Sequence, residues 1–289
     1  MNKNDIFSIL QRLGGAFMVP IAVLPVAGML LGVGGSFSNA STIALYPILD
    51  HKWLQAVFTI MTNSGGVVFA NLPLLFAVAL SSSFANEEKG VAGLAGALGF
   101  LIMHTTIHTV LSLTGTLAEP DVMVANGQGM VLGIQTLEMS VFGGILVGLV
   151  TSWLHNKYRQ IELNQMLAFF GGVRFVPIVV SLTFIIIGSL MTFIWPVIQS
   201  GISALVYLVD HTGYIGTFFY GMFERLLIPM GLHHVFYLPF WQTPLGGTLE
   251  IGGRMVSGAQ NIFFAQVADS SIDHFHNGTA RFMAVIFRQ

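Results

Sequence analysis

The segment from Glu224 to His234 combines charged and imidazole side chains with apolar residues. It reads Glu-Arg-Leu-Leu-Ile-Pro-Met-Gly-Leu-His-His. Charge in such apolar surroundings is costly and is retained mainly where a solute, an ion or a proton needs it. Consecutive helical residues point about 100° apart, so Glu224 and Arg225 do not face each other well and each needs its own partner. The pattern favours a solute-binding site over a structural ion pair.

Two pairs of histidines raise the alternative of a metal site. His233 and His234 are adjacent, and His104 and His108 lie four residues apart on one face of a predicted helix. Adjacent histidines cannot easily bind one ion from a helix, no Glu-x-x-His spacing occurs, and the chain has no cysteine. We therefore predict no metal and no cofactor, and we expect His104 and His108 to make polar contacts between helices.

Aromatic residues are concentrated around the charged segment. The apolar faces of sugar rings stack on aromatic side chains, whereas sugar hydroxyls need polar partners, and a site built this way rejects analogues that lack the hydroxyls. The composition therefore favours a sugar site, with an aromatic belt at the membrane interface as the alternative. The aromatic residues are Tyr214, Phe218, Phe219, Tyr220, Phe223, Phe236, Tyr237, Phe240 and Trp241.

These side chains must be positioned by elements that lie in a membrane. Of 289 residues, 54% are hydrophobic and only 8% are charged, against about 25% charged in soluble domains. Four runs without Asp, Glu, Lys or Arg each exceed the roughly 20 residues that a transmembrane helix needs. The runs are Leu13–Leu49, Trp53–Asn86, Gly90–Ala118 and Phe175–Val209. The sequence predicts an all-α, polytopic transmembrane helix bundle.

We expect five helical spans and then a less regular region, Ile198–Phe240. Helix breakers at Asn63–Gly66 and Asn71–Pro73 interrupt the second span, and Pro229 and Gly231 interrupt the region after Arg225. Broken or re-entrant helices in membranes usually line a cavity, because their freed backbone groups need partners. A kink stabilised by a neighbouring helix is the alternative. The expected spans are Gly15–Val33, Val57–Ser82, Gly90–Leu113, Leu132–Trp153 and Phe175–Trp195.

Small residues and surface segments complete the pattern. Gly93 with Gly96, and Gly143 with Gly144 and Gly148, predict close helix packing. Apolar spacing in Ile161–Phe170 suits a short amphipathic interfacial helix, with a plain connecting helix as the alternative.

The placement of basic residues indicates the orientation in the membrane. Basic residues precede the first span and follow the fourth but are absent from Ser112–Met130, which favours a cytoplasmic N-terminus. No basic patch for nucleic acid is present.

Several blocks of the sequence together resemble a known family. The segment Gly221–His234 resembles the signature of the membrane (IIC) component of the sugar phosphotransferase system, in its glucose/maltose branch. The likeness runs from about Asp5 to Ala284, and its last part is similar to maltose and other alpha-glucoside members. The further matching blocks are Pro20–Gly34, Phe69–Ala77, Phe170–Ile178, Phe263–Asp269 and Arg281–Met283.

The resemblance implies a permease of the bacterial inner membrane. Members bind sugar outside the cell, move a transport domain against a dimeric scaffold, and release a sugar phosphate whose phosphoryl group comes from a phosphocysteine on a cytoplasmic IIB domain. By similarity, Glu224, Arg225 and His233 would contact sugar hydroxyls. His234 and Asn71 are further candidates, and no catalytic residue is assigned. Residues 1–200 would be mainly scaffold, and residues 201–289 would begin the transport part of one IIC-type domain, 1–289.

The family pattern continues beyond the printed sequence. Members carry a later Thr-Glu-Pro segment whose Glu binds sugar, a second re-entrant hairpin and often a IIB portion. The likeness ends at Ala284, so we expect a C-terminally truncated chain without IIB or IIA that does not transport alone. The alternatives are an ion-coupled secondary sugar transporter, an inactive remnant of a permease, and a metal-dependent membrane enzyme that uses His104 and His108.

Overall fold

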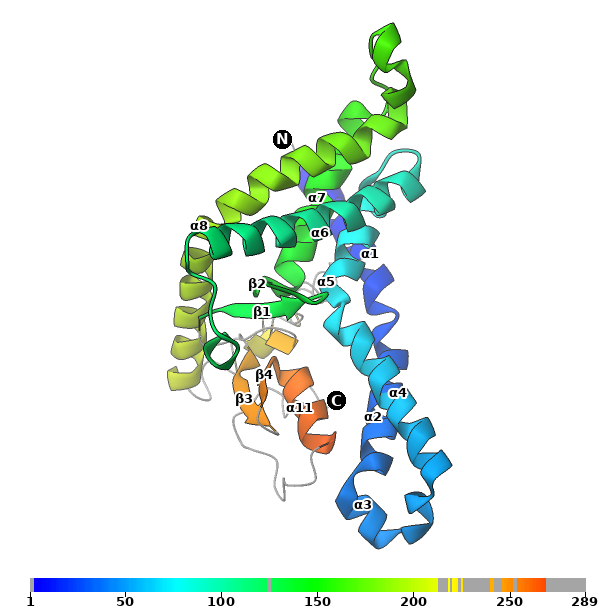
Figure 1. Ribbon diagram of the computed structural model, residues 1–289, viewed down its shortest axis with the longest axis vertical. Coiled ribbons are helices and arrows are strands. Elements are labelled where there is room, and N and C mark those ends of the chain that lie inside the picture. The colour runs from blue at the N-terminus through cyan, green and yellow to red at the C-terminus, as the bar shows by residue number, and fades with distance from the viewer. Residues whose placement is uncertain are drawn as a thin grey trace. The chain divides into compact units, whose positions relative to one another are not determined.

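The computed structural model describes most of the chain and is mainly helical (Figure 1). Its described residues fall into two compact units, Met1–Ala70 with Ile202–Gln289, and Asn71–Gly201. The helical bundle predicted from the sequence is confirmed, with two short β-hairpins in addition. The described residues are 3–123, 126–212, 218, 220–222, 225, 240–241, 246–251 and 254–268.

The membrane-spanning character of the chain is visible in its longest helices. Among the described residues, Gln11–Ser38, Lys89–Leu113 and Gly172–Gly201 are long and apolar enough to cross a membrane. Helices α4 (Lys52–Ala70) and α5 (Leu72–Phe84) together would form a fourth, broken span. The chain is therefore a multi-pass membrane protein.

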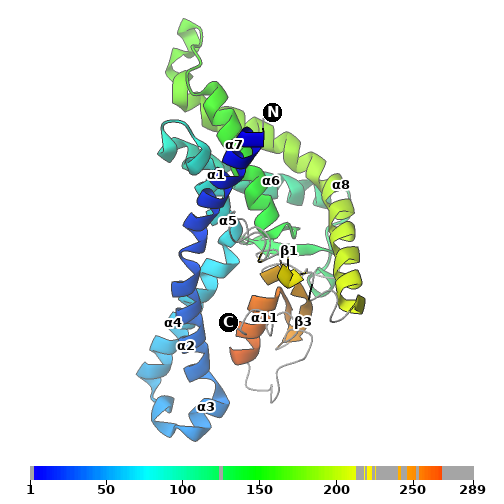
Figure 2. The ribbon, with the colours of Figure 1, turned by 180° about the vertical axis from the view of Figure 1, so that it is seen from behind.

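In the first unit, helices α2 (Leu24–Ser38) and α4 run side by side (Figures 1 and 2). Their approach is close because Gly65 faces α2, where an added Cβ would lie 2.5 Å from the Ala27 carbonyl oxygen and 2.6 Å from the Leu31 nitrogen. The predicted break at Asn63–Gly66 is therefore wrong, since α4 continues through it. The glycines there serve helix packing, which the membrane favours at small residues.

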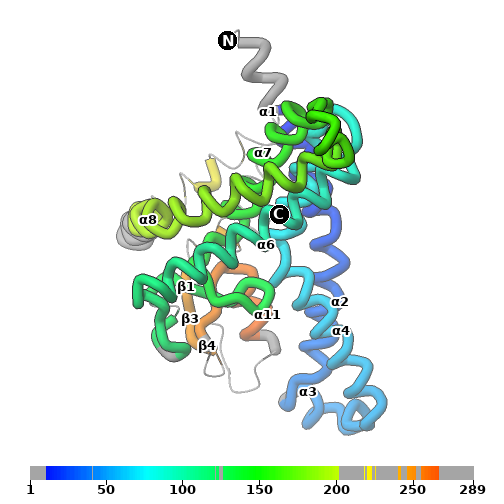
Figure 3. The backbone as a smooth tube through the Cα atoms, turned by 45° about the horizontal axis from the view of Figure 1, so that its top comes forward, coloured from blue at the N-terminus to red at the C-terminus, as the bar shows by residue number. Residues whose placement is uncertain are grey.

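The remaining elements of the first unit lie at both ends of the chain. Helix α1 (Lys3–Ile21) precedes α2, and α3 (Ala40–Leu45) with the 3-10 helix η1 (Pro47–Asp50) joins α2 to α4 (Figure 3). Strands β3 (Thr248–Ile251) and β4 (Arg254–Ser257) form an antiparallel hairpin, and α11 (Ala259–Ala268) follows it. The long helix α8 (Phe175–Thr212) begins in the second unit.

In the second unit, α5 packs against both α6 (Lys89–Leu113) and α7 (Ser140–Tyr158). Glycines make both approaches possible. Gly96 of α6 lies against Ser81 and Ala77, and a Cβ on Gly148 of α7 would lie 2.5 Å from Leu80 Cβ. Gly144 of α7 lies directly on the Pro73 carbonyl group. The predicted role of these glycines in close packing is confirmed.

The fourth expected span, Leu132–Trp153, is only partly helical. Helix α7 begins at Ser140, and the residues before it form an antiparallel hairpin of β1 (Gln128–Val131) and β2 (Ile134–Leu137). The two-residue turn has φ +51° at Leu132 and +81° at Gly133. Positive φ at both positions defines the turn that matches the twist of paired strands, and Gly133 adopts it at little cost.

The expected interfacial helix in Ile161–Phe170 is shorter than predicted and is a 3-10 helix. Helix η3 spans Gln165–Phe170, and the side chain of Asn164 accepts a hydrogen bond from the Gln165 nitrogen at its start. The short 3-10 helix η4 (Gly172–Arg174) then leads into α8. The Asn164 cap explains why the helix begins there, because Asn readily satisfies a free amide at a helix N-terminus.

The contact between Gly144 and Pro73 yields a test of the helix packing. Replacing Gly144 with Val places side-chain atoms on the Pro73 backbone, which cannot move without displacing α5. We therefore expect the free energy of unfolding to fall by about 1–3 kcal/mol or more. Gly90→Ala is the matched control, because a Cβ there meets nothing within 4 Å. Thermal unfolding of both variants in detergent measures the effect. Equal midpoints for Gly144→Val and the unmodified chain would show that the approach is not tight.

Candidate functional site

Of the charged segment predicted to bind solute, the structure describes Arg225. It is helical and its side chain is exposed. Glu224, His233 and His234 lie outside the described residues, so their predicted convergence with Arg225 stays a prediction. What the structure does describe is how the two flanks of this segment are placed.

The flanks meet through aromatic side chains. The rings of Tyr220 and Phe240 pack edge to face with centroids 4.8 Å apart, and Tyr220 is buried. Edge-to-face pairs of this kind are a favourable aromatic geometry. This packing brings Tyr220, before the charged segment, and Phe240, after it, into direct contact.

Close backbone packing fixes Phe240, at the downstream flank of the charged segment. Gly246 lies directly against the carbonyl group of Phe240 and close to the nitrogen of Ala259, the first residue of α11. Only a residue without a side chain fits between two backbone segments in this way. The β3–β4 hairpin and α11 therefore hold the downstream flank of the charged segment.

Asn71, the predicted site residue outside this segment, occupies the break between α4 and α5. It lies at the N-cap position of α5 with φ −106° and ψ 12°, and its carbonyl oxygen accepts a hydrogen bond from the Leu75 nitrogen at 3.1 Å. Pro73 stands at the start of α5, where its missing N–H costs nothing. The predicted interruption is thus confirmed at Asn71, and its predicted contact with sugar stays a prediction.

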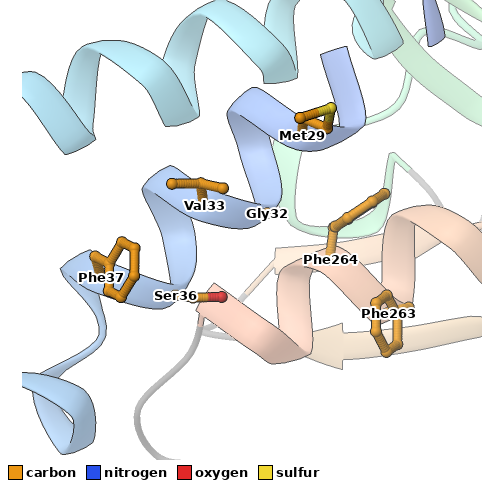
Figure 4. A pocket seen from close by; sticks show the side chains of 7 residues that line it. All are labelled: Met29, Gly32, Val33, Ser36, Phe37, Phe263 and Phe264. Atoms are coloured by element: carbon orange, nitrogen blue, oxygen red, sulfur yellow. The ribbon is translucent and has the colours of Figure 1, made fainter. Parts of the chain in front are cut away.

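A groove of about 410 Å³ lies between α2 and α11 in the first unit (Figure 4). Phe264 reaches across it to Gly28, at 3.6 Å from a Cβ built there, and packs on Phe69 with ring centroids 5.8 Å apart. The lining is apolar except for Ser36. A sugar in this groove would leave most of its hydroxyls unpaired, which argues against it as the sugar site.

The histidines of α6 contact the β1–β2 hairpin. His104 is buried, with its Nδ1 3.2 Å from Thr136 Oγ1. His108 Nδ1 donates to the Gln135 carbonyl oxygen at 2.7 Å. The predicted contact of these histidines with another helix is therefore wrong. Their partners lie in this hairpin, which replaces the start of the next expected helix. The described residues contain no cluster of three or more His, Cys, Asp or Glu suited to a metal ion.

Side-chain amides connect the hairpin to the end of α6. Gln128 donates to the Thr116 carbonyl oxygen at 2.8 Å and accepts from the Ala118 nitrogen at 3.0 Å. Gln135 donates to the Ala118 carbonyl oxygen at 2.7 Å and to Gln128 Oε1 at 3.1 Å. Buried polar networks of this kind rigidify a fold when their members are satisfied. The network fixes the hairpin on the residues that follow α6.

Glu138 is a buried acid that the sequence reasoning missed. Its carboxylate accepts a hydrogen bond from the Ser140 nitrogen at 3.1 Å and lies against Gly129. Its backbone carbonyl accepts from Trp195 Nε1 at 3.0 Å. Burial raises the pKa of Glu138, which lies between β2 and α7, while the Ser140 N–H lowers it by less. A signal was available, because Glu138 is the only charged residue in the expected span Leu132–Trp153.

Comparison with known proteins agrees with this architecture. Residues 14–287 match the family described as Phosphotransferase system, EIIC. The match includes nearly the whole chain, so the chain belongs to this family of membrane components. The resemblance found in the sequence blocks is thereby confirmed.

Three relatives show which members of this family the chain resembles. The PTS system maltose-specific EIICB component of Escherichia coli (strain K12) is 38% identical over 98% of this chain. The glucoside-specific EIICBA component of Staphylococcus carnosus (strain TM300) is 41% identical over 91%, and the glucose-specific EIICBA component of Staphylococcus saprophyticus is 39% identical over 92%. The chain spans 54% of the length of the first relative and 39% of each of the other two.

The burial of Glu138 predicts a pH-dependent stability. Its folded-state pKa is raised, so folding favours the protonated form, and stability is lost as the pH rises from the unfolded pKa through the folded pKa. Glu138→Gln removes this loss and keeps an acceptor for Ser140. We expect the variant to be the more stable one near neutral pH and to lose less stability as the pH rises from acidic to neutral values.

Thermal unfolding of the purified chain across this pH range measures the difference. Glu119→Gln is the matched control, because Glu119 is an exposed carboxylate in the same unit. A Glu138→Gln profile parallel to that of the unmodified chain would show that Glu138 does not carry the effect.

Proposed function

We propose that the chain is the membrane-spanning, sugar-binding part of a sugar phosphotransferase permease for a glucose- or maltose-like sugar. The observation that carries this proposal is the family match over residues 14–287, which includes the charged segment Glu224–His234. The relatives' names add glucose, glucoside and maltose as substrates of those proteins. A partner IIB domain supplies the phosphoryl group.

The charged segment would bind the sugar. Glu224 accepts hydrogen bonds from sugar hydroxyls, and Arg225 and His233 donate them, with His234 and Asn71 as further contacts. The aromatic contact of Tyr220 with Phe240 supports this arrangement, because it places two aromatic rings of the kind that stack on sugars at the flanks of the segment. A polar site of this kind discriminates by leaving its groups unpaired when a hydroxyl is missing.

The proposed organisation has residues 1–200 as mainly scaffold and residues 201–289 as the start of the transport part, in a homodimer. The N-terminus faces the cytoplasm. The ion pair of Glu87 with Arg159 supports this orientation, because it joins the turn before α6 to the end of α7. Both connections carry basic residues, which are enriched on the cytoplasmic side. The IIB domain would dock near Lys89 and near Lys157–Arg174.

Phosphoryl transfer then requires little covalent chemistry from this chain. The sugar hydroxyl forms the new oxygen–phosphorus bond, and the sulfur–phosphorus bond of the donor breaks. Positioning and charge supply most of the catalysis in such transfers. The contribution of Glu224, Arg225 and His233 is therefore to hold one hydroxyl in line with the donor.

An uptake experiment distinguishes this proposal from an ion-coupled transporter. Membrane vesicles that contain the chain are given labelled maltose with a phosphorylated IIB donor, with an ion gradient alone, or with both. The proposal expects that any sugar phosphate formed requires the donor, and uptake driven by the gradient alone would overturn it. Where neither condition gives uptake, labelled maltose is titrated into the purified chain, and a lack of saturable binding would identify an inactive remnant.

Arg225→Lys tests the role of the guanidinium. Lys keeps the charge but loses the planar fork that holds two hydroxyl oxygens, so we expect maltose or glucose binding to weaken at least about ten-fold. Arg174→Lys is the matched control, because Arg174 is an exposed arginine outside the charged segment. Equilibrium binding of radiolabelled sugar to the purified chain provides the measurement. An unchanged affinity in Arg225→Lys would remove Arg225 from the site.

A further inference from the structure

The segment η3 exposes a compact group of large apolar side chains. Met166 is 94% exposed, Phe169 70%, Leu167 53% and Phe170 45%. Soluble surfaces rarely carry contiguous apolar patches of this kind without a binding role. These side chains need an environment that shields them from water. The position of η3 in the chain and the nearby charged side chains indicate what that environment is.

The position of η3 in the chain places it at a membrane boundary. The helix ends at Phe170, and a membrane-spanning segment begins at Gly172. Backbone geometry allows about 3.3–3.6 Å per residue, so η3 cannot lie far from the end of that span. The exposed side chains are therefore close to the level where headgroups meet acyl chains.

Two cationic side chains before and after η3 in the sequence rest on aromatic rings. Lys157 Nζ lies 5.0 Å from the ring centroid of Trp153 and 5.2 Å from that of Tyr158. The guanidinium of Arg174 lies 4.9 Å from the ring centroid of Phe169. Tyr and Trp beside Lys and Arg are the usual anchors at a bilayer surface.

The two cations belong to one surface. The rings of Tyr158 and Phe175, the chain neighbours of Lys157 and Arg174, pack with centroids 6.1 Å apart. Between Trp153 and Arg174, Glu162 is the one acidic residue against Lys157, Arg159 and Arg174, and Glu87 from outside this stretch pairs with Arg159. The surface therefore combines an apolar group with an excess of positive charge.

Resting on the orientation proposed above, we propose that this surface, formed by Trp153, Lys157, Tyr158, η3 and Arg174, binds anionic phospholipid from the cytoplasmic leaflet and leaves the turn at Lys89 for the IIB domain. The side chains of η3 enter the boundary between headgroups and acyl chains, and Lys157 and Arg174 neutralise lipid phosphates. A zwitterionic lipid satisfies the apolar group but not the charge. The site thus selects by headgroup charge, and the expected preference is about five-fold for each basic side chain.

The absence of cysteine in the chain allows a direct test of insertion. Met166→Cys introduces a single thiol, which is labelled with an environment-sensitive dye and placed in nanodiscs of phosphatidylcholine with phosphatidylglycerol. We expect quenching by lipids that carry a nitroxide near the headgroup and little quenching by iodide in solution. Strong iodide quenching would overturn the proposal and point to a surface for a protein partner.

Charge selectivity is tested by lipid retention. The chain is purified from mixed phosphatidylcholine and phosphatidylglycerol, and the retained lipids are counted by native mass spectrometry. We expect Lys157→Gln and Arg174→Gln each to lower the ratio of phosphatidylglycerol to phosphatidylcholine about five-fold, and the control Lys52→Gln, an exposed lysine of the first unit, to leave it unchanged. Equal ratios in all variants would refute a headgroup-selective site.

Discussion

The need to pair backbone polar groups that leave water shapes the described structure. In lipid an unsatisfied N–H or C=O costs several kcal/mol, so a chain can leave the helical conformation only where other groups replace the lost hydrogen bonds. The β1–β2 hairpin meets this condition. Its own strands pair, and Gln128 and Gln135 satisfy the irregular backbone at Thr116 and Ala118. His104 and His108 then bind the hairpin to α6.

Much of the helical architecture could be predicted because it depends on local composition. Long uncharged runs predict spans, and Gly96, Gly144 and Gly148 predict close helix approach, which α5 provides on both sides. Two local predictions are wrong, for different reasons. The glycines at Gly65–Gly66 predict a break, although they accommodate α2, a partner distant in sequence. The apolar residues at Leu132–Leu137 predict a helix, although the local turn at Leu132 and Gly133 folds them back as a strand on β1.

The candidate site also combines features that the sequence predicts with features that it does not predict. The type and spacing of its residues, from Glu224 to His234, could be recognised from sequence because charge is rare in apolar surroundings. The contact of Tyr220 with Phe240 could not be predicted from periodicity, since the residues between them carry no regular pattern. The role of Glu138 could not be predicted from its position in an expected span, because its burial depends on the β1–β2 hairpin that replaces the start of that span. Its cost is offset by the amide of Ser140 at the start of α7, a place that favours a carboxylate.

The packing of α11 explains why sequence blocks far apart belong together. Phe264 of α11 contacts Gly28 in the first family-like block and packs on Phe69, which begins the second. At the other end of α11, Ala259 lies against Gly246, which in turn lies on the backbone of Phe240. A continuous series of contacts within one unit thus connects α2 and α4 to the flank of the charged segment. A bulky residue at Gly28 would therefore act on the segment at a distance, because α11 would have to shift and carry Gly246 and Phe240 with it.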